Sequence, residues 1–408
     1  MHILFVHQNF PAQFGPIGRR LNREHGFHCT FFTNHPPRDV APDFEVIPYR
    51  TLGGATRNTH YFARSFENAV AHAHGVFEAC RARTDLRPDL VVAHSGFGSS
   101  LFLRERFTCP IVNYFEYFYH PHDSDLDFRP DFPAVERDVL RSYCRNAMLL
   151  LDLENCDAGY SPTDWQRSRF PAAYQSKLTT IFDGIDTEIW HRRAEVPRRI
   201  ANRTVDDDTR IVTYVSRGFE SMRGFDIFMR VAKRIYEQSP NVVFAVVGTD
   251  RTAYGGDHRH TGGKSFRHYV LEQDDYDLGK FIFTGQLPQG DLADLLSLSD
   301  LHIYLTVPFV LSWSLFNALA CGATVLASDT APVRELITHQ ETGLLAPFFD
   351  VDEFTRLALD VLRDPAAFRP LADRGRRLID NKYSLERSLP QMVSLYKTVL
   401  SELDCADG

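Results

Sequence analysis

The chain has 408 residues, a formal net charge of −8 at pH 7, and hydrophobic residues at 44% of its positions. This length exceeds what one ordinary core needs and predicts two or three domains. The acidic balance argues against nucleic acid as the main partner. Seven scattered cysteines with no CxxC pair favour reduced thiols over a disulfide framework or a zinc site.

The amino terminus and the hydropathy pattern predict a cytoplasmic protein. The first apolar run spans only about five residues and lacks a basic region before it, so it does not resemble a signal peptide. No stretch approaches the roughly 20 apolar residues that a membrane span needs. Peripheral contact with the inner face of a membrane is left open.

Short apolar runs alternate with helical periodicities through the first half of the chain. The runs that predict buried strands are 3–6, 29–32, 90–93 and 111–114. Helical spacing is seen at Phe14, Ile17 and Leu21 and again over residues 63–83. Strands that alternate with helices predict a parallel α/β sheet with right-handed crossovers.

The same alternation begins again in the second half. Strands are predicted at 210–216, 242–247, 281–284, 301–305 and 323–327, and a helix follows the first of them. We therefore expect an α/β protein with two Rossmann-like, doubly wound domains, at 1–190 and 209–384. The polar stretch 191–208 is the predicted linker. Residues 385–408 are a predicted helix that can pack back on the first domain. Ligands of such folds bind at the carboxyl ends of the strands, here in a cleft between the domains.

Two arginines flank the turn after the first strand of the second half. Arg217 ends that strand, and Arg223 precedes Gly224 at the expected start of a helix. Guanidinium groups pair bidentately with phosphate oxygens, and a helix N-terminus adds positive potential. The pattern predicts a diphosphate site; ordinary surface arginines are the alternative interpretation.

A second anion site is predicted after the strand at 301–305. A compact loop from Thr306 leads into a helix of small residues that starts near Ser314 and reaches Gly322. The first N–H groups of a helix lack partners inside it, so we expect them to face the cleft. The alternative is an alanine-rich helix that packs closely on the sheet and binds nothing.

Several segments, in this order along most of the chain, resemble one family. They are His7-Gln8-Asn9-Phe10-Pro11 before Gly15, Ser161-Pro162-Thr163, Phe182-Asp183-Gly184-Ile185-Asp186-Thr187, Arg217 with Arg223-Gly224, Asn317-Ala318-Leu319-Ala320-Cys321-Gly322, Pro332-Val333-Arg334-Glu335, and Glu341-Thr342-Gly343. They look like the corresponding segments of retaining glycosyltransferases of family 4, and the opening resembles a bacterial subgroup. The resemblance implies the GT-B fold.

The resemblance also implies roles for single residues. Arg217 and Arg223 would hold the donor diphosphate, and His94 would contact the transferred sugar, although a histidine among 17 can equally be structural. These three form the predicted catalytic set. The predicted donor-binding set is Gly15, Ser216, Gly285, Ser312, Trp313, Ser314, Leu315 and Asn317. On the acceptor side the expected residues are Asn9, Phe10 and Glu116.

One feature departs from the family pattern. The family commonly carries two glutamates separated by seven residues, the second of which binds the donor ribose. This chain has Phe309 and Asn317 at those places. The amide of Asn317 can still bond ribose hydroxyls, but Phe309 cannot through its side chain.

An acidic loop offers a weaker alternative. It contains Glu116, His120, His122, Asp123, Asp125 and Asp127, which can be interpreted as a metal site or as a loop that faces the acceptor. The family needs no bound metal, so we expect neither a metal nor another cofactor.

The predicted function is transfer of a hexose-type sugar from UDP- or GDP-sugar to a glycan, lipid-linked or small-molecule acceptor, with retention. The resemblance implies that the leaving diphosphate takes the acceptor proton. Two alternatives are a nucleotide-sugar epimerase of the same fold and a non-catalytic sugar-nucleotide binder, for which Phe309 and Asn317 argue.

Overall fold

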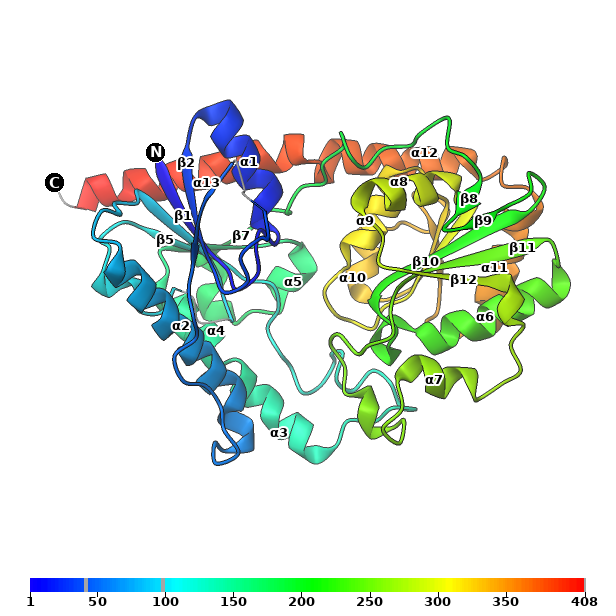
Figure 1. Ribbon diagram of the computed structural model, residues 1–408, viewed down its shortest axis with the longest axis horizontal. Coiled ribbons are helices and arrows are strands. Elements are labelled where there is room, and N and C mark those ends of the chain that lie inside the picture. Colours follow the sequence, from blue (N-terminus) through cyan, green and yellow to red (C-terminus); the bar gives the residue numbers. More distant parts are fainter. Residues whose placement is uncertain (40–42, 97–99, 407–408) are drawn as a thin grey trace. The chain divides into compact units, whose positions relative to one another are not determined.

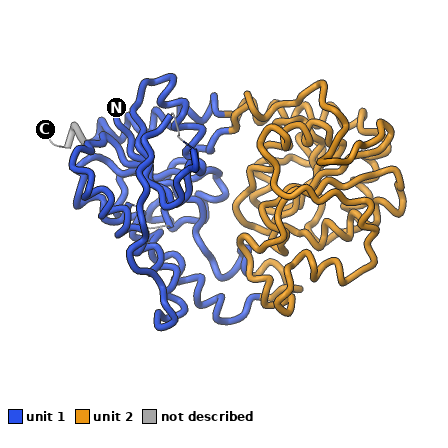
Figure 2. Tube along the Cα trace, in the orientation of Figure 1, with its two compact units in different colours: residues 1–126, 134–184, 385–408 blue, residues 127–133, 185–384 orange. Residues whose placement is uncertain are grey.

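The computed structural model describes residues 1–39, 43–96 and 100–406, and the chain divides into two compact units (Figure 2). Unit 1 comprises residues 1–126, 134–184 and 385–408, and unit 2 comprises 127–133 and 185–384. The main segment of unit 2 therefore begins at Ile185, earlier than the boundary expected after residue 190. Unit 2 also includes the short segment 127–133 from the first half of the chain.

Unit 1 contains a seven-stranded sheet in the order β3-β2-β1-β4-β5-β6-β7, with every neighbouring pair parallel. Its strands are β1 (His2–Val6), β2 (His28–Thr33), β3 (Glu45–Pro48), β4 (Leu90–His94), β5 (Ile111–Tyr114), β6 (Ala158–Ser161) and β7 (Leu178–Thr180). Its α-helices are α1 (Phe14–His25), α2 (Arg64–Ala82), α3 (Glu136–Arg145), α4 (Ala147–Asn155), α5 (Asp164–Ser168) and α13 (Leu385–Ala406) (Figure 1).

Successive residues of β1 alternate between two apolar clusters. Ile3 and Phe5 pack in a cluster with residues of α1 and α13, whereas Leu4 and Val6 pack with residues of α2 and α4. A strand covered on both faces must be apolar throughout, because either face would otherwise bury a polar side chain. This is why the continuous run near the amino terminus predicted the strand correctly.

The last helix of the chain, α13, completes the core of unit 1. It lies beside α1 (Figure 1). Leu389, Met392 and Tyr396 are buried among side chains of β1, β2 and β4. The core of unit 1 is therefore closed by residues nearly 400 positions from its first strand.

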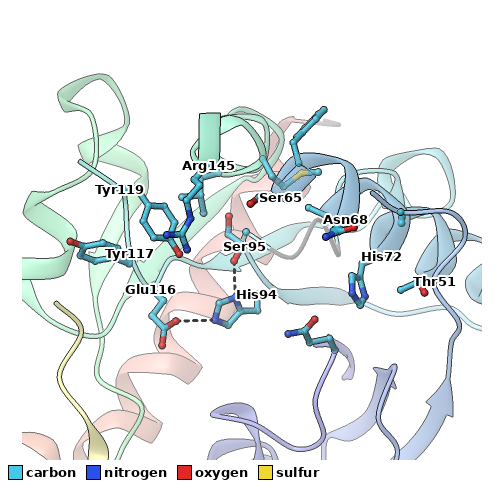
Figure 3. A pocket seen from close by; sticks show the side chains of 18 of the residues that line it. Thr51, Ser65, Asn68, His72, His94, Ser95, Glu116, Tyr117, Tyr119 and Arg145 are labelled. Atoms are coloured by element: carbon cyan, nitrogen blue, oxygen red, sulfur yellow. Dashed lines mark hydrogen bonds and ion pairs between the residues drawn. The ribbon is translucent and has the colours of Figure 1, made fainter. Parts of the chain in front are cut away.

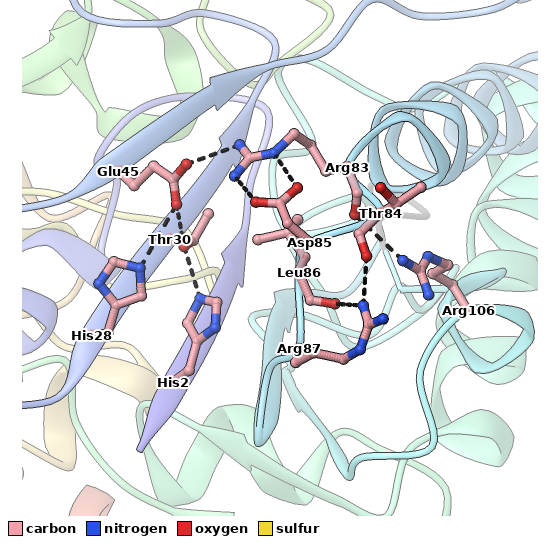
Figure 4. A network of polar contacts seen from close by, with 10 residues as sticks. All are labelled: His2, His28, Thr30, Glu45, Arg83, Thr84, Asp85, Leu86, Arg87 and Arg106. Carbon is pink, nitrogen blue, oxygen red and sulfur yellow. Dashed lines mark hydrogen bonds and ion pairs between the residues drawn. The ribbon is translucent and has the colours of Figure 1, made fainter.

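A polar network ties the edge of this sheet to the end of α2 (Figure 4). Arg83 donates to Glu45 at 2.8 Å and to Asp85 at 2.9 and 2.7 Å. The hydroxyl of Thr30 donates to the other oxygen of Glu45 at 3.0 Å. Since Glu45 opens β3, these bonds hold the edge strand in register with β2.

Unit 2 contains a six-stranded parallel sheet in the order β12-β11-β10-β13-β14-β15. The strands are β10 (Arg210–Gly218), β11 (Val242–Thr249), β12 (Phe281–Gly285), β13 (Leu301–Tyr304), β14 (Val325–Ser328) and β15 (Leu344–Ala346). The helices are α6 (Phe225–Gln238), α7 (Phe266–Leu271), α8 (Gln289–Leu298), α9 (Trp313–Ala320), α10 (Ala331–Arg334), α11 (Val351–Arg363) and α12 (Arg369–Leu378). The expected α/β architecture of two parallel sheets is confirmed.

The stretch 191–208 is not the free linker that its composition predicted. It contains a hairpin of β8 (Arg199–Ile200) and β9 (Arg203–Thr204). Ile200 and Val205 are buried in a cluster with residues of β10 and β11. Two apolar side chains among many charged ones are therefore enough to anchor this stretch in unit 2.

None of the helices in the described part of the chain is both long enough and apolar enough to span a membrane.

Removing the Tyr396 side chain should destabilise unit 1 selectively. Tyr396 is only 1% exposed, so Tyr396→Ala leaves a large cavity and should lower the free energy of unfolding by about 3–5 kcal/mol. Urea denaturation followed by circular dichroism measures the loss. Lys397→Ala, at the exposed neighbouring position, is the control and should change stability by less than about 0.5 kcal/mol. Equal stability of the two variants would contradict the assigned packing of α13.

Candidate functional site

In unit 2 the carboxyl end of β10 presents an exposed arginine. The pairing of β10 with β11 shifts between Val215 and Gly218. Ser216 is buried, and its hydroxyl donates to the carbonyl of Gly218 at 2.7 Å. Arg217 is exposed, and within the described residues its side chain makes no hydrogen bond or ion pair. The shift in pairing therefore leaves the guanidinium of Arg217 available to a ligand.

Arg223 differs from the sequence prediction. It lies directly before α6, as expected, but it is only 5% exposed. Its guanidinium donates to the hydroxyl of Thr306 at 2.7 Å and to the carbonyl of Val310 at 3.2 Å from both terminal nitrogens. In this structure Arg223 holds the loop before α9, instead of converging with Arg217 on open space.

Two aromatic rings flank the buried guanidinium. Arg223 lies 5.4 Å from the ring centre of Tyr254 and 5.9 Å from that of Phe309. The faces of aromatic rings attract cations, so Phe309 supports Arg223 at the position where the family commonly has a glutamate.

Sequence analysis missed Glu220, which holds Tyr254 in place. Glu220 is fully buried, and one carboxylate oxygen accepts from the N–H groups of Ala253, Tyr254 and Gly255 at 3.1, 2.9 and 3.1 Å. Burial raises the pKa of this carboxyl above its usual range. A single glutamate after a strand gives no signal of this role, because its partners lie more than 30 residues away in the chain.

The loop after β13 leads into α9 as predicted. Ser312 is the N-cap of α9, and its own N–H donates to the hydroxyl of Tyr304 at 2.9 Å. The N–H of Ser314 donates to the Ser312 hydroxyl at 3.3 Å, and that of Leu315 donates to the Ser312 carbonyl at 3.1 Å. The expectation that these two N–H groups are free is therefore wrong, because the cap residue satisfies both. Trp313 is 37% exposed.

Asn317 carries an unsatisfied acceptor. It lies in α9 and is 6% exposed, and its side-chain oxygen Oδ1 has no hydrogen-bond partner among the described residues. A buried carbonyl oxygen without a partner costs free energy, so its retention needs a reason. Gly285, at the end of β12, has a φ of +73° and no atom within 4 Å of where a Cβ would stand, so its surroundings are open.

Unit 1 contains a cavity of about 470 Å³ at the carboxyl ends of β4 and β5 (Figure 3). Its polar lining comes from several parts of unit 1. The polar lining residues are Gln8, Thr51, Ser65, Asn68, His72, His94, Ser95, Glu116, Tyr117, Tyr119 and Arg145. The guanidinium of Arg145 stacks on the ring of Tyr119 at 3.5 Å. Hydroxyl, amide and aromatic groups in one cavity suit a polyhydroxylated ligand.

His94 and Glu116 meet at this cavity, as Figure 3 shows. The ring nitrogen Nδ1 of His94 lies 2.7 Å from the carbonyl of Ser95, which assigns the proton to Nδ1. The other nitrogen, Nε2, lies 3.9 Å from a carboxylate oxygen of Glu116. Burial lowers the pKa of His94 to about 4, so the ring is neutral at pH 7 and Nε2 can accept from a hydroxyl.

The other predicted residues of the first loop lie outside this cavity. Phe10 packs on Phe31 and Phe44, with ring centres 5.0 and 5.6 Å away, so it belongs to the apolar cluster of unit 1. The backbone N–H of Asn9 donates to the ring of His7 at 2.9 Å. A Cβ on Gly15 would come within 2.7 Å of the Pro11 side chain, so this glycine serves local packing. The residue of this loop that lines the cavity is Gln8, which sequence analysis missed.

Asp152 positions the turn after His94. It is fully buried in α4 and accepts from the Ser95 hydroxyl at 2.8 Å, the Gly96 N–H at 3.3 Å and the Ser100 hydroxyl at 3.3 Å. These bonds fix both sides of a stretch whose middle, 97–99, lies outside the described residues. Burial raises the pKa of Asp152 to about 6 in spite of these donors.

The acidic loop shows no clustered metal ligands. Within the described ranges, no group of three or more His, Cys, Asp or Glu side chains is placed to hold a metal ion. Asp125 accepts from the hydroxyl of Tyr117 at 2.7 Å, and a ring nitrogen of His120 lies 2.9 Å from the carbonyl of Arg169. Independence from metal stays a prediction.

Each unit is an α/β fold with a parallel sheet and has polar groups at the carboxyl ends of its strands, where ligands of such folds bind. Comparison with known families is more specific than the fold. Residues 25–190 match the "Glycosyl transferase family 4 group", and residues 197–383 match "Glycosyl transferases group 1". The chain belongs to this glycosyltransferase family, which confirms the resemblance that the motifs indicated.

Curated relatives are distant and matched in part. N-acetyl-alpha-D-glucosaminyl L-malate synthase of Bacillus anthracis is 21% identical over 55% of this chain and 55% of its own length. D-inositol 3-phosphate glycosyltransferase of Kribbella flavida is 24% identical over 47% of this chain and 44% of its own. The chain thus spans about half the length of these relatives.

Solved structures share the whole fold. Sucrose-phosphate synthase from Thermosynechococcus elongatus superposes with a TM-score of 0.75 at 20% identity, covering 98% of this chain and 100% of that one. Anabaena HepE, solved in complex with UDP-glucose, gives a TM-score of 0.65 at 14% identity, with 98% and 100% covered. The predicted GT-B fold is confirmed.

The raised pKa of Asp152 makes stability depend on pH in a definite direction. The folded state keeps the proton up to about pH 6, whereas the unfolded state releases it near pH 4. The stability due to this group is therefore complete below about pH 4 and is lost as the pH rises through 6, by about 3 kcal/mol. Denaturation of Asp152→Asn and the parent at several pH values checks this. The parent should lose stability relative to the variant between pH 4 and 7, and a constant difference would contradict it.

Proposed function

We propose that this protein transfers a hexose from a UDP- or GDP-sugar to a hydroxyl of a glycan, lipid-linked or small-molecule acceptor, with retention at the anomeric carbon. The observation that carries the proposal is the exposed guanidinium of Arg217 at the carboxyl end of β10, which pairs with none of the described residues, in a chain of this family. The presence of UDP-glucose in the HepE structure supports the donor class.

In this proposal Arg217 binds the donor diphosphate directly. Its guanidinium can pair bidentately with phosphate oxygens, and no carboxylate of the described residues competes for it. Arg223 acts in support, because it holds the Val310 carbonyl and thereby the loop that leads to Ser312. Arg217 thus binds the donor, and Arg223 positions the loop.

Asn317 is assigned to the donor ribose. Its unpartnered Oδ1 can accept a hydrogen bond from a ribose hydroxyl, which would relieve the cost of its burial. The amide is a weaker acceptor than the carboxylate that the family commonly has at this place. The same ligand therefore explains both the departure from the family and the unsatisfied atom.

The cavity of unit 1 is assigned to the sugars. His94 is neutral at pH 7, so its Nε2 accepts a hydrogen bond from a hydroxyl of the transferred sugar without presenting a charge. Glu116, Asn68 and Tyr119 line the same cavity and provide further hydrogen bonds. A stacked arginine and tyrosine at its wall can also contact the apolar face of a sugar ring.

The chemistry needs little acid–base work from the protein. Retention by two carboxylates requires a pair about 5 Å apart, and of the described residues that line the cavity of unit 1 only Glu116 is acidic. In front-face transfer the C–O bond to the β-phosphate breaks, the acceptor oxygen bonds to the anomeric carbon on the same face, and its proton passes to the phosphate oxygen. The role of Arg217 is then to stabilise the charge that grows on the leaving diphosphate.

The proposal is tested by incubating the protein with UDP- and GDP-sugars. Thermal shift identifies the donor, and chromatography follows the products with and without an acceptor alcohol. A transferase releases nucleoside diphosphate slowly alone and faster with acceptor, and NMR reads the configuration of the product. Conversion to an isomeric nucleotide sugar would instead show the epimerase, and binding without turnover would show the non-catalytic binder. Activity should persist in EDTA.

Arg217→Ala should weaken nucleoside diphosphate binding by about 1.5–3 kcal/mol, the range for a hydrogen bond to a charged group. Affinity for the nucleoside alone should stay unchanged, because the lost contact is to phosphate. Calorimetry measures both affinities. Arg377→Ala removes another exposed arginine, in α12, and should have no effect. Unchanged diphosphate affinity in Arg217→Ala would refute the assignment.

Asn317→Leu should raise the stability of the free protein and lower its affinity for the nucleotide sugar. The substitution keeps the size of the side chain and removes the unsatisfied oxygen, so the free protein should gain up to about 1 kcal/mol. The affinity for the nucleotide sugar should fall by about 1 kcal/mol, since a hydrogen bond to the ribose is lost. Thermal denaturation and calorimetry provide the two readings. A variant that binds as tightly as the parent would mean that Asn317 does not contact the donor.

A further inference from the structure

A second cavity of about 330 Å³ lies in unit 2, away from the donor residues. Asp300 and Thr324, which line it, directly precede β13 and β14, whereas Arg217 lies at the carboxyl end of β10 and Thr306 comes after that of β13. Because all strands of this sheet are parallel, the cavity lies at the opposite edge of the sheet from the donor site. Nothing in the proposed transfer reaction uses it.

The lining of this cavity is strongly basic. It contains four arginines and one acidic residue: Arg192, Arg193, Arg198, Arg369 and Asp300. Asp300 accepts from the backbone N–H of Ile211 at 2.8 Å, so its carboxylate is already engaged with β10. One carboxylate against four guanidiniums leaves the lining with an excess of positive charge.

Two of the arginines are occupied by the fold. Arg193 pairs with Asp294 at 2.6 Å and donates to the carbonyl of Gly290 at 3.0 Å. Arg198 donates to the carbonyls of Asp206 and Thr209. These bonds anchor the stretch around the hairpin of β8 and β9, so the two arginines shape the cavity wall.

The other two arginines converge on one weak acceptor. Arg192 and Arg369 each donate to the carbonyl of Gly322, at 3.4 and 3.5 Å. Arg192 forms no ion pair within the described residues, and Arg369 has only Asp373 at 3.6 Å. Partial burial, together with the nearby charge of Arg376, lowers the pKa of Arg369. Two guanidiniums that share a neutral oxygen at long distance have donors left for an anion.

A buried hydroxyl completes the set. Thr324 is 5% exposed and lines the cavity, and its side-chain hydroxyl makes no hydrogen bond among the described residues. A hydroxyl on the cavity wall that bonds no described residue can donate to a ligand. A guanidinium pair and a hydroxyl are the groups that bind tetrahedral oxyanions.

We propose that Arg192, Arg369 and Thr324 form a binding site for a phosphate group, either free or carried by a small phosphorylated sugar. The cavity volume exceeds what a phosphate alone fills and leaves space for one sugar ring. The site sits against Gly322, which directly follows the C-cap of α9, the helix that carries Asn317. A bound anion would compete for the guanidiniums that now hold the Gly322 carbonyl.

Calorimetry in the Arg217→Ala background tests the site, because that variant is expected to weaken phosphate binding by the donor residues. Inorganic phosphate and glucose 6-phosphate are titrated separately at constant ionic strength, with chloride as the blank. One bound phosphate group per chain is expected. Tighter binding of glucose 6-phosphate identifies a sugar phosphate as the ligand, and tighter binding of inorganic phosphate identifies the free anion. No heat with either at 10 mM would overturn the proposal.

Substitutions then locate the bound anion. Arg192→Ala and Arg369→Ala should each lower the affinity at least about tenfold, and Thr324→Val should lower it less while preserving shape. Arg377→Ala, on the same helix as Arg369, should leave the affinity unchanged. Circular dichroism verifies that the variants are folded. Arg369→Lys keeps the positive charge at this position but loses the bidentate geometry of the guanidinium. Equal affinity in the parent and both alanine variants would place the anion elsewhere. None of these results depends on whether the protein transfers a sugar.

Discussion

The contacts of the Arg223 guanidinium are the interactions on which the proposed donor site of unit 2 depends. The guanidinium is buried without an ion pair among the described residues, and it is held by the Thr306 hydroxyl, the Val310 carbonyl and the faces of Tyr254 and Phe309. A buried charge is tolerated only when its donors are satisfied. These contacts therefore fix the loop between β13 and α9. The fixed loop places Ser312 as the N-cap of α9.

The parts of the fold that the sequence predicted are those governed by local patterns. The apolar run of β1 and the helical spacing of α1 follow from burial on two faces and on one, respectively. The positions of Arg217, His94 and Ser312 at the ends of strands or the start of a helix follow from the same alternation. Rules that act over a few residues were sufficient for these elements.

Long-range contacts account for what the sequence did not predict. Phe10 was expected on the acceptor side, and in the structure its ring also packs on Phe31 and Phe44, partners that nothing near Phe10 in the chain indicates. The N–H groups of Ser314 and Leu315 were expected to be free, yet the cap residue satisfies them. The stretch 191–208 reads as a linker by composition, while two of its residues belong to a core. Composition averages over residues, whereas burial is decided one side chain at a time.

The place of α13 has a consequence for the biosynthesis of the protein. Unit 1 is built from three separate segments, and its last helix supplies Leu389, Met392 and Tyr396 to the cluster around β1. On the ribosome the first sheet emerges long before these residues exist, so its α13-facing surface stays uncovered until α13 has been made. Unit 2 needs nothing beyond residue 384 and can close first. Unit 1, whose sheet is made before that of unit 2, can therefore complete its core only after unit 2 has all its residues.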